Sequence, residues 1–223
     1  MITAVYIALG LIVLGVLINL VWRRISHYQA IPCPSWLSWM VEMDNPFTRV
    51  SHAQFIIDHL GLDPDMKVLD AGCGPGRVTL PLAEAVGPRG EVVAVDIQNE
   101  MLVRVRTKAE MAGLANIRYL QAELGQGDLP LGIFNRAVLV SVLGEVPHQT
   151  KALKEIHDAL QPGGILSITE VVFDPHFQGC EKMRRLIVNA GFTEEAFYGK
   201  RLAYTMHVKK PDKIALKKTK RCN

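Results

Sequence analysis

The stretch "VLDAGCGPGRV", residues 68–78, places three glycines in five positions directly after strand-forming residues. Val68 and Leu69 fit a buried strand, and Gly72, Gly74 and Gly76 allow a tight turn that other residues resist. Apolar residues at helical spacing follow, over Arg77–Val86. The pattern predicts a strand, a glycine loop and a helix, as at a nucleotide site of a Rossmann-like sheet. An ordinary tight strand-to-helix turn is the alternative.

Two carboxylates narrow the class of ligand. The run "EVVAVD" ends at Asp96, where a second strand would bring a carboxylate to the hydroxyls of a ribose. Asp70 comes just before the glycines, where it would repel a diphosphate and attract an ammonium group. This favours S-adenosylmethionine over a dinucleotide. The alternative role for Asp96 is to cap the helix expected from Asn99.

The chain from about Asn45 to Pro211 resembles the class I S-adenosylmethionine-dependent methyltransferases, and in particular compact microbial members of unassigned substrate. Residues 70–76 match the family's D-x-G-C-G-x-G loop, and "LQPGGILSITE", residues 160–170, resembles its turn into strand five. The resemblance implies a Rossmann-like α/β fold, with a mostly parallel seven-stranded sheet flanked by helices. It implies a ribose-binding Asp96, an apolar Ile97 beside the adenine and a Glu123 at the adenine amino group. The full implied cofactor set is Asp70, Gly72, Cys73, Gly74, Gly76, Asp96, Ile97, Met101, Ala122, Glu123 and Ser141.

The sequence departs from the family after the fourth strand. Asn135 stands where many relatives begin that strand with aspartate, and Gly144 precedes Glu145 where related sequences often have histidine. Because ligands bind at the carboxyl ends of strands in such sheets, Glu145, His148, Glu170 and His176 are the titratable candidates. We expect Glu145 and His176 on the substrate side. The alternative for all four is a structural role, in which the side chain forms hydrogen bonds to backbone groups at turns or helix ends. The remaining histidines form no ligand set, so no metal is predicted.

The front of the chain predicts a membrane anchor. Ile2–Trp22 carries no charge, and 21 residues of helix span roughly 30 Å, the thickness of a bilayer core. Arg23 and Arg24 follow this run and no cation precedes it, so the globular part is expected in the cytoplasm, on a single-pass membrane protein. The alternative, a cleaved signal peptide, lacks a basic start and a small-residue cleavage site.

Charge is concentrated at the other end. Residues 209–223 hold seven Lys or Arg and one Asp, a net of +6, so the rest of the chain is net −3. A slightly acidic body argues against a nucleic-acid partner. The basic tail suits anionic lipid headgroups, and a solvated terminus without a role is the alternative.

Four segments are therefore expected: an anchor over residues 1–24, connecting or lid helices over 25–60, the methyltransferase domain over 61–211 and a basic tail over 212–223. The connecting segment has an apolar stripe, which is either core or a lid, and a helix opened by Pro46 with Val50, Ala53, Ile57 and Leu60 inward. Further helices are expected over Asn99–Ala112 and His148–Leu160, and two antiparallel strands close the sheet. The stripe consists of Trp36, Trp39, Met40 and Met43.

The four cysteines, Cys33, Cys73, Cys180 and Cys222, show neither metal spacing nor a dense disulfide pattern, which fits a reducing compartment. Together the features predict methyl transfer to a small, apolar or lipid-like acceptor such as a quinone precursor. The competing hypothesis is a membrane adaptor that keeps the cofactor fold without the chemistry.

Overall fold

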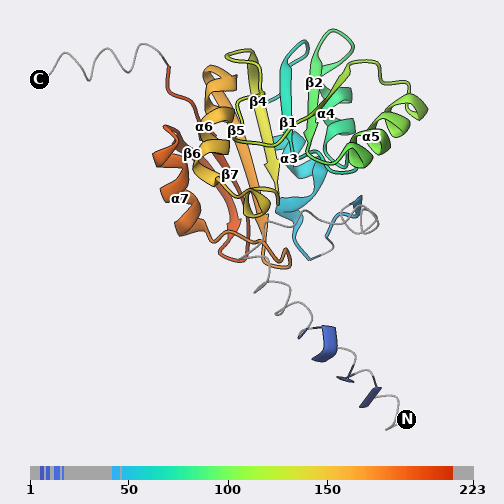
Figure 1. The fold of residues 1–223 in the computed structure, drawn as a ribbon, viewed down its shortest axis with the longest axis vertical. Helices are drawn as coiled ribbons and strands as arrows, with labels where there is room; N and C mark the ends of the chain where they lie inside the picture. Colours follow the sequence, from blue (N-terminus) through green and yellow to red (C-terminus); the bar gives the residue numbers. More distant parts are fainter. Residues whose placement is uncertain are drawn as a thin grey trace, which may run out of the picture.

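The structure is a computed structural model that describes residues 6, 7, 9, 10, 13–15, 17, 42–45 and 47–212 (Figure 1). Most of the predicted anchor, most of the apolar stripe and nearly all of the basic tail lie outside the described residues. In the part of the chain that is described, no helix has the length and apolar character needed to cross a bilayer.

Seven strands of the described chain form one sheet in the order β3-β2-β1-β4-β5-β7-β6. The first five pair in parallel, whereas β7 is antiparallel to β5 and β6 is antiparallel to β7. The predicted mostly parallel sheet of seven strands, closed by an antiparallel pair, is confirmed. The strands are β1 Lys67–Ala71, β2 Glu91–Asp96, β3 Ile117–Gln121, β4 Phe134–Val140, β5 Leu160–Val171, β6 Thr193–Lys200 and β7 Ala203–Lys209.

Helices cover both faces of the sheet, as the buried central strands require. On one face, α3, α4 and α5 pack over Val68, Val92 and Val138. On the other, α6 and α7 pack over Leu69, Val93 and Leu139, because neighbouring strand residues point to opposite faces. The helical elements are η2 Arg49–Ser51, α3 Ala53–His59, α4 Thr79–Val86, α5 Asn99–Met111, η3 Leu143–Glu145, α6 Gln149–Ala159 and α7 Cys180–Asn189.

The helix predicted from Pro46 is different in the structure. It is divided into η2 and α3, because His52 between them is extended, with ψ of 140°. The interruption turns Ile56 into the core, fully buried, and leaves Ile57 only partly buried. The predicted inward positions Ala53 and Leu60 are buried as expected.

The helix predicted over Asn99–Ala112 is present, and its four expected apolar positions, Met101, Leu102, Val105 and Ala109, are buried. The arrowheads of β4 and β5 in Figure 1 point to the same edge of the sheet, and the described N-terminal residues extend from that side. This carboxyl edge holds the residues singled out in the sequence.

Candidate functional site

The glycine loop joins β1 to α4, as predicted. Gly72, Gly74 and Gly76 have positive φ angles of 77°, 50° and 92°, which disfavour any residue with a side chain. A Cβ atom at position 72 would lie 2.4 Å from Cγ2 of Val142, and one at position 76 would lie 2.9 Å from Cδ1 of Leu80. At these two positions the backbone conformation and the protein's own atoms require glycine, whether or not a ligand approaches the loop.

Asp96 holds the loop from the end of β2. Its Oδ2 accepts a hydrogen bond from the backbone N–H of Gly74 at 2.9 Å, and its Oδ1 accepts one from the N–H of Gln98 at 2.9 Å. Gln98 is the N-cap of α5, and its side chain forms no capping hydrogen bond. Asp96 lies two residues before the N-cap and contacts this end of the helix through the N–H of Gln98. Its carboxylate links the loop after β1 to the end of β2, at the place where we expect the ribose.

Asp70 lies at the end of β1 and is almost fully buried. Its Oδ2 accepts a hydrogen bond from the hydroxyl of Thr79 at 2.6 Å. Burial raises its pKa to about 6, with a smaller contribution from the charge of Asp96, while the Thr79 hydrogen bond opposes the shift. Burial also raises the pKa of Asp96. Two buried carboxyl groups of the same charge, with raised pKa values, form a site that a cationic ligand would stabilise.

The residues expected around an adenine lie at the ends of β2 and β3. The side chain of Ile97 is 46% exposed although it is apolar, so it offers a free face beside Asp96. The backbone N–H of Ala122 donates to the carbonyl of Asp96 at 3.1 Å, which places Ala122 and its neighbour Glu123 beside Asp96. Both residues are partly exposed.

Three further predicted cofactor residues are packed or strained. Cys73 is buried, and burial raises the pKa of its thiol far above the ordinary value, so the thiol stays protonated. Met101 is 2% exposed and belongs to the inner face of α5. Ser141 has a positive φ of 54°, and its N–H donates to the carbonyl of Thr169 at 2.9 Å. A strained serine at the end of β4 is consistent with a functional position.

Glu145 and His176, which come from different loops, are brought together. Nδ1 of His176 lies 3.7 Å from Oε1 of Glu145 and 3.6 Å from Oδ1 of Asp174. Burial alone would lower the pKa of His176, but its interactions with Asp174 and Glu145 outweigh burial and raise it. Nε2 of His176 is buried and has no hydrogen-bond partner among the described residues.

Gly144 explains how His176 reaches this position. A Cβ atom at residue 144 would lie 1.9 Å from the carbonyl oxygen of His176, so only glycine permits the contact. The histidine that related sequences carry at this position would collide with the backbone of His176. The loop after β5 thus brings a histidine next to Glu145 although the loop after β4 lacks one.

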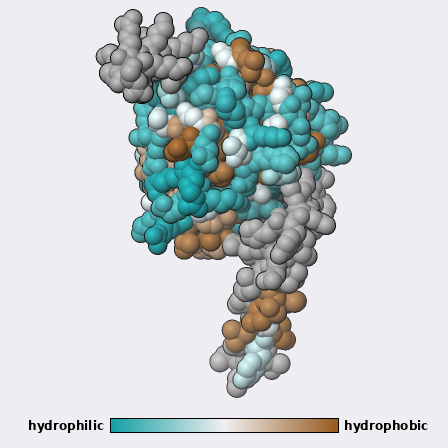
Figure 2. Space-filling model, turned by 60° about the vertical axis from the view of Figure 1, so that its left-hand side comes forward, coloured by the Kyte–Doolittle hydropathy of each residue, from teal (hydrophilic) through white to brown (hydrophobic). Residues whose placement is uncertain are grey.

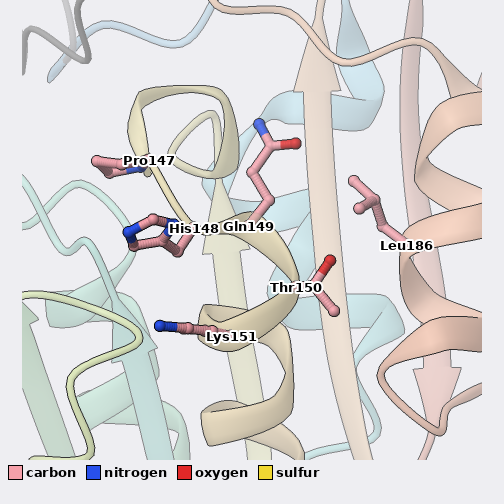
Figure 3. Close-up of a pocket in the computed structure, with 6 residues that line it drawn as sticks. All are labelled: Pro147, His148, Gln149, Thr150, Lys151 and Leu186. Atoms are coloured by element: carbon pink, nitrogen blue, oxygen red, sulfur yellow. The ribbon is translucent and has the colours of Figure 1, made fainter.

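The other two candidates have different surroundings. Glu170 is buried; its Oε2 accepts a hydrogen bond from the N–H of Gln178 at 2.9 Å, and burial raises its pKa well above the usual value. His148 lines a cavity of about 350 Å³ between the start of α6 and Leu186 of α7 (Figure 3). In Figure 3 the polar lining comes from one short segment, residues 148–151.

Contacts from the N-terminal side of the domain were not predicted. Asp44 forms an ion pair with Arg77 of the glycine loop, and Glu42 pairs with Lys108 at 2.7 Å. Nζ of Lys108 also donates to the carbonyl of Pro75 at 2.8 Å. These contacts link residues far apart in the chain, and nothing in their local sequence pattern indicates the pairing.

The described site has features that S-adenosylmethionine requires. Gly74 has no side chain, and its backbone is oriented by a hydrogen bond to Asp96, the residue before the exposed Ile97. The buried carboxyl group of Asp70 favours a ligand with a positive charge. The described residues contain no cluster of three or more His, Cys, Asp or Glu arranged to hold a metal ion. The fold and this site define a class I S-adenosylmethionine-dependent methyltransferase.

Comparison with known proteins agrees with this class. The chain belongs to the methyltransferase domain family, which matches residues 62–218. It is 33% identical over 148 residues to the ubiquinone/menaquinone biosynthesis C-methyltransferase UbiE of Vibrio vulnificus (strain YJ016), over 61% of this chain and 57% of that protein. It is 34% identical over 134 residues to UbiE of Shewanella oneidensis, over 60% of this chain and 52% of that protein. The chain thus spans little more than half the length of these relatives.

Solved structures share the fold. A S-adenosylmethionine-dependent methyltransferase from Aquifex aeolicus has a TM-score of 0.70 at 21% identity, over 80% of this chain and 99% of that one. The [4+2]-cyclase SpnF has a TM-score of 0.64 at 16% identity, over 72% of this chain and 80% of that one. Since one of these neighbours is a cyclase, the fold alone does not determine the reaction.

Proposed function

We propose that this protein transfers a methyl group from S-adenosylmethionine to a small, apolar acceptor that resides in or near a membrane. The observation that carries the proposal is that two pairs lie in loops at the carboxyl ends of the parallel strands: Asp96 with Gly74 after β2 and β1, and His176 with Glu145 after β5 and β4. The UbiE relatives, named for ubiquinone and menaquinone biosynthesis, support a quinone precursor as the acceptor class.

When bound, the cofactor supplies an electrophilic methyl group on a sulfonium. The chain's contribution is to hold the acceptor in line with that methyl group and to exclude water. The proposed catalytic residues are Glu145 and His176. An acceptor that loses a proton as it is methylated would pass it to the His176–Glu145 pair, in which the charge of Glu145 stabilises the imidazolium.

Membrane association is part of the same proposal. Six described apolar residues of the front segment are each more than half exposed: Tyr6, Ile7, Leu9, Val13, Leu14 and Leu17. In Figure 2 the described front residues form a largely hydrophobic projection from the body. These observations support the anchor. We propose further that the domain lies in the cytoplasm, because Arg23 and Arg24 follow the apolar run, and that the basic tail is a second contact with anionic lipid.

The test uses radiolabelled S-adenosylmethionine and the purified full chain with membrane and soluble extracts. We expect a labelled product in the lipid phase of the membrane extract. At a limiting concentration of the cofactor, Asp96→Ala is expected to lower the amount of this product, because it weakens cofactor binding. His176→Asn is expected to lower turnover while leaving binding of S-adenosylhomocysteine unchanged. A labelled product from the soluble extract alone would disprove the apolar acceptor.

The second candidate is a cofactor-binding membrane adaptor without methyl transfer. Gly144, in place of the histidine found in related sequences, is the residue that favours it. The close approach of His176 to Gly144 weighs against it, because a histidine is still present beside Glu145. Cofactor binding without methyl consumption over a broad panel of acceptors would decide for the adaptor.

A further inference from the structure

Three apolar side chains lie exposed at the carboxyl edge of the sheet. Phe47 is 83% exposed, Phe173 is 60% exposed and Leu202 is 62% exposed. They come from the segment before η2, the loop after β5 and the turn between β6 and β7. We refer to Phe47, Phe173 and Leu202 as the edge patch.

The contacts of the fold hold these three segments together. The rings of Phe47 and Phe173 lie 6.4 Å apart between centroids. The N–H of Val172 donates to the carbonyl of Leu202 at 2.7 Å, and Val171 pairs with Ala203 in the sheet. The edge patch is therefore one surface built from three separate parts of the chain, and such a surface exposed to water has a cost unless something covers it.

Cations flank the patch. Arg49 follows Phe47 by two positions, and Lys200 and Arg201 precede Leu202; all three are exposed. The acidic residue next to Phe173 is Asp174, which is partly buried and directed at His176. Protruding aromatic and aliphatic groups surrounded by Lys and Arg match the boundary between acyl chains and anionic headgroups.

The position of the patch relates it to the reaction. Phe173 lies three residues before His176 in the loop that carries this histidine to Glu145. Figure 1 shows the described front residues on this same side, and Figure 2 shows hydrophobic surface at the lower end of the body. A bilayer contacting the patch would thus face the substrate side of the site.

We propose that the edge patch rests in the surface of an anionic bilayer, so that an apolar acceptor passes from lipid into the site without crossing water. This inference rests on the proposed function, because it names the surface by which that site reaches its acceptor. It differs from the anchor, which would hold the chain on the membrane without determining which face of the domain meets the lipid.

Depth-dependent quenching tests the orientation in the full chain. Phe173→Trp adds an indole to the patch, and Leu131→Trp adds one at an exposed residue of the opposite edge, before β4. Each protein is reconstituted in vesicles of brominated phosphatidylcholine with phosphatidylglycerol, and the emission of the unsubstituted chain is subtracted. We expect the bromolipid to quench most of the emission added at position 173 and little of that at 131. If Phe173→Trp misfolds, Leu202→Trp provides the same measurement.

Charge removal adds a quantitative test. The variant Lys200→Gln, Arg201→Gln is made in the chain that carries the added indole. The ratio of domains with the patch in the bilayer to domains with the patch in water is expected to fall about fivefold for each cation removed, because each contributes about 1 kcal/mol near an anionic surface. Omitting phosphatidylglycerol should lower the quenching in the same way. Unchanged quenching in both cases would contradict the electrostatic part of the proposal.

The outcomes separate this inference from the proposed function. An unquenched residue 173 in an enzyme that still methylates a vesicle-borne quinone overturns the seated patch alone. An indole at 173 that is shielded from water before any vesicle is added shows that another part of the chain covers the patch, and it also overturns the inference. If residue 173 is quenched but no methylated lipid product forms, the result supports insertion of the edge patch into the bilayer and contradicts the proposed apolar acceptor.

Discussion

The carboxylate of Asp96, at the end of β2, accepts a hydrogen bond from the backbone N–H of Gly74, in the loop after β1, at 2.9 Å. The same side chain accepts a second bond from the N–H of Gln98. One carboxylate thus sets the conformation of the loop and stands where the ribose is expected. Loss of this side chain should weaken cofactor binding in two ways, because it removes the partner of the ribose and the two hydrogen bonds that hold the loop.

We predict that Asp96→Ala weakens binding of S-adenosylhomocysteine by about 10- to 100-fold, because hydrogen bonds to a charged group contribute about 1.5–3 kcal/mol. Isothermal titration calorimetry measures the change. Asp58→Ala, at an exposed carboxylate of α3, is the matched control and should leave affinity unchanged. Equal affinities for Asp96→Ala and the unsubstituted chain would mean that Asp96 does not contact the cofactor.

Gly72→Ala is predicted to destabilise the fold by about 2–4 kcal/mol, since it adds a Cβ against Val142 at a φ of 77°. Gly113→Ala tests the conformational part alone, at a φ of 69° with nothing within 4 Å, and should cost about 1 kcal/mol. Urea denaturation followed by circular dichroism measures both. Val142→Ala in the Gly72→Ala background should recover part of the loss, and no recovery would show that the clash is not with Val142.

Binding of the cofactor is predicted to release up to about half a proton per site near pH 6. Burial raises the pKa of Asp70 to about 6, so the empty site is partly protonated there, and a bound ammonium group would favour the carboxylate. Calorimetry in two buffers with different ionisation enthalpies counts the protons. The release should vanish in Asp70→Asn and at pH 8. A binding enthalpy that does not depend on the buffer at pH 6 would exclude Asp70 as the partner of the cation.

Glu170→Gln is predicted to stabilise the protein at pH 7 and above, and the gain is expected to shrink as the pH falls toward 4.5. Burial raises the pKa of Glu170 well above 4.5, so the unfolded chain loses its proton first and the unsubstituted protein loses stability as pH rises above 4.5. The amide keeps an acceptor for the N–H of Gln178 and cannot ionise. Thermal unfolding between pH 5 and pH 8 measures the profile.

Glu84→Gln, at an exposed position of α4, is the control for that profile and should change nothing. If Glu170→Gln follows the pH dependence of the unsubstituted protein, Glu170 is not the group responsible. A Tm below that of the unsubstituted protein at every pH would instead indicate that the charged form of Glu170 stabilises the fold.

The sequence alone determined the fold and the class of cofactor, because both depend on local patterns. Alternating burial predicts strands, the glycines predict a turn with positive φ, and the acidic residues come at the ends of strands that must meet at one edge. Asp70, Gly74 and Asp96 lie where that reasoning places them. The predicted length of the helix after Pro46 was wrong, because the extended backbone of His52 divides it. No proline or glycine at that point indicates the interruption in the sequence.

Only the tertiary structure decided what the loops bring together. His176 lies beside Glu145 because Gly144 lets the backbone of a distant loop approach. Asp44, from the N-terminal side of the domain, pairs with Arg77 of the glycine loop. Gly72 is required by Val142 as well as by its φ angle. These are contacts between segments remote in sequence, and their geometry depends on how the sheet and its two helical layers pack, which no local periodicity encodes.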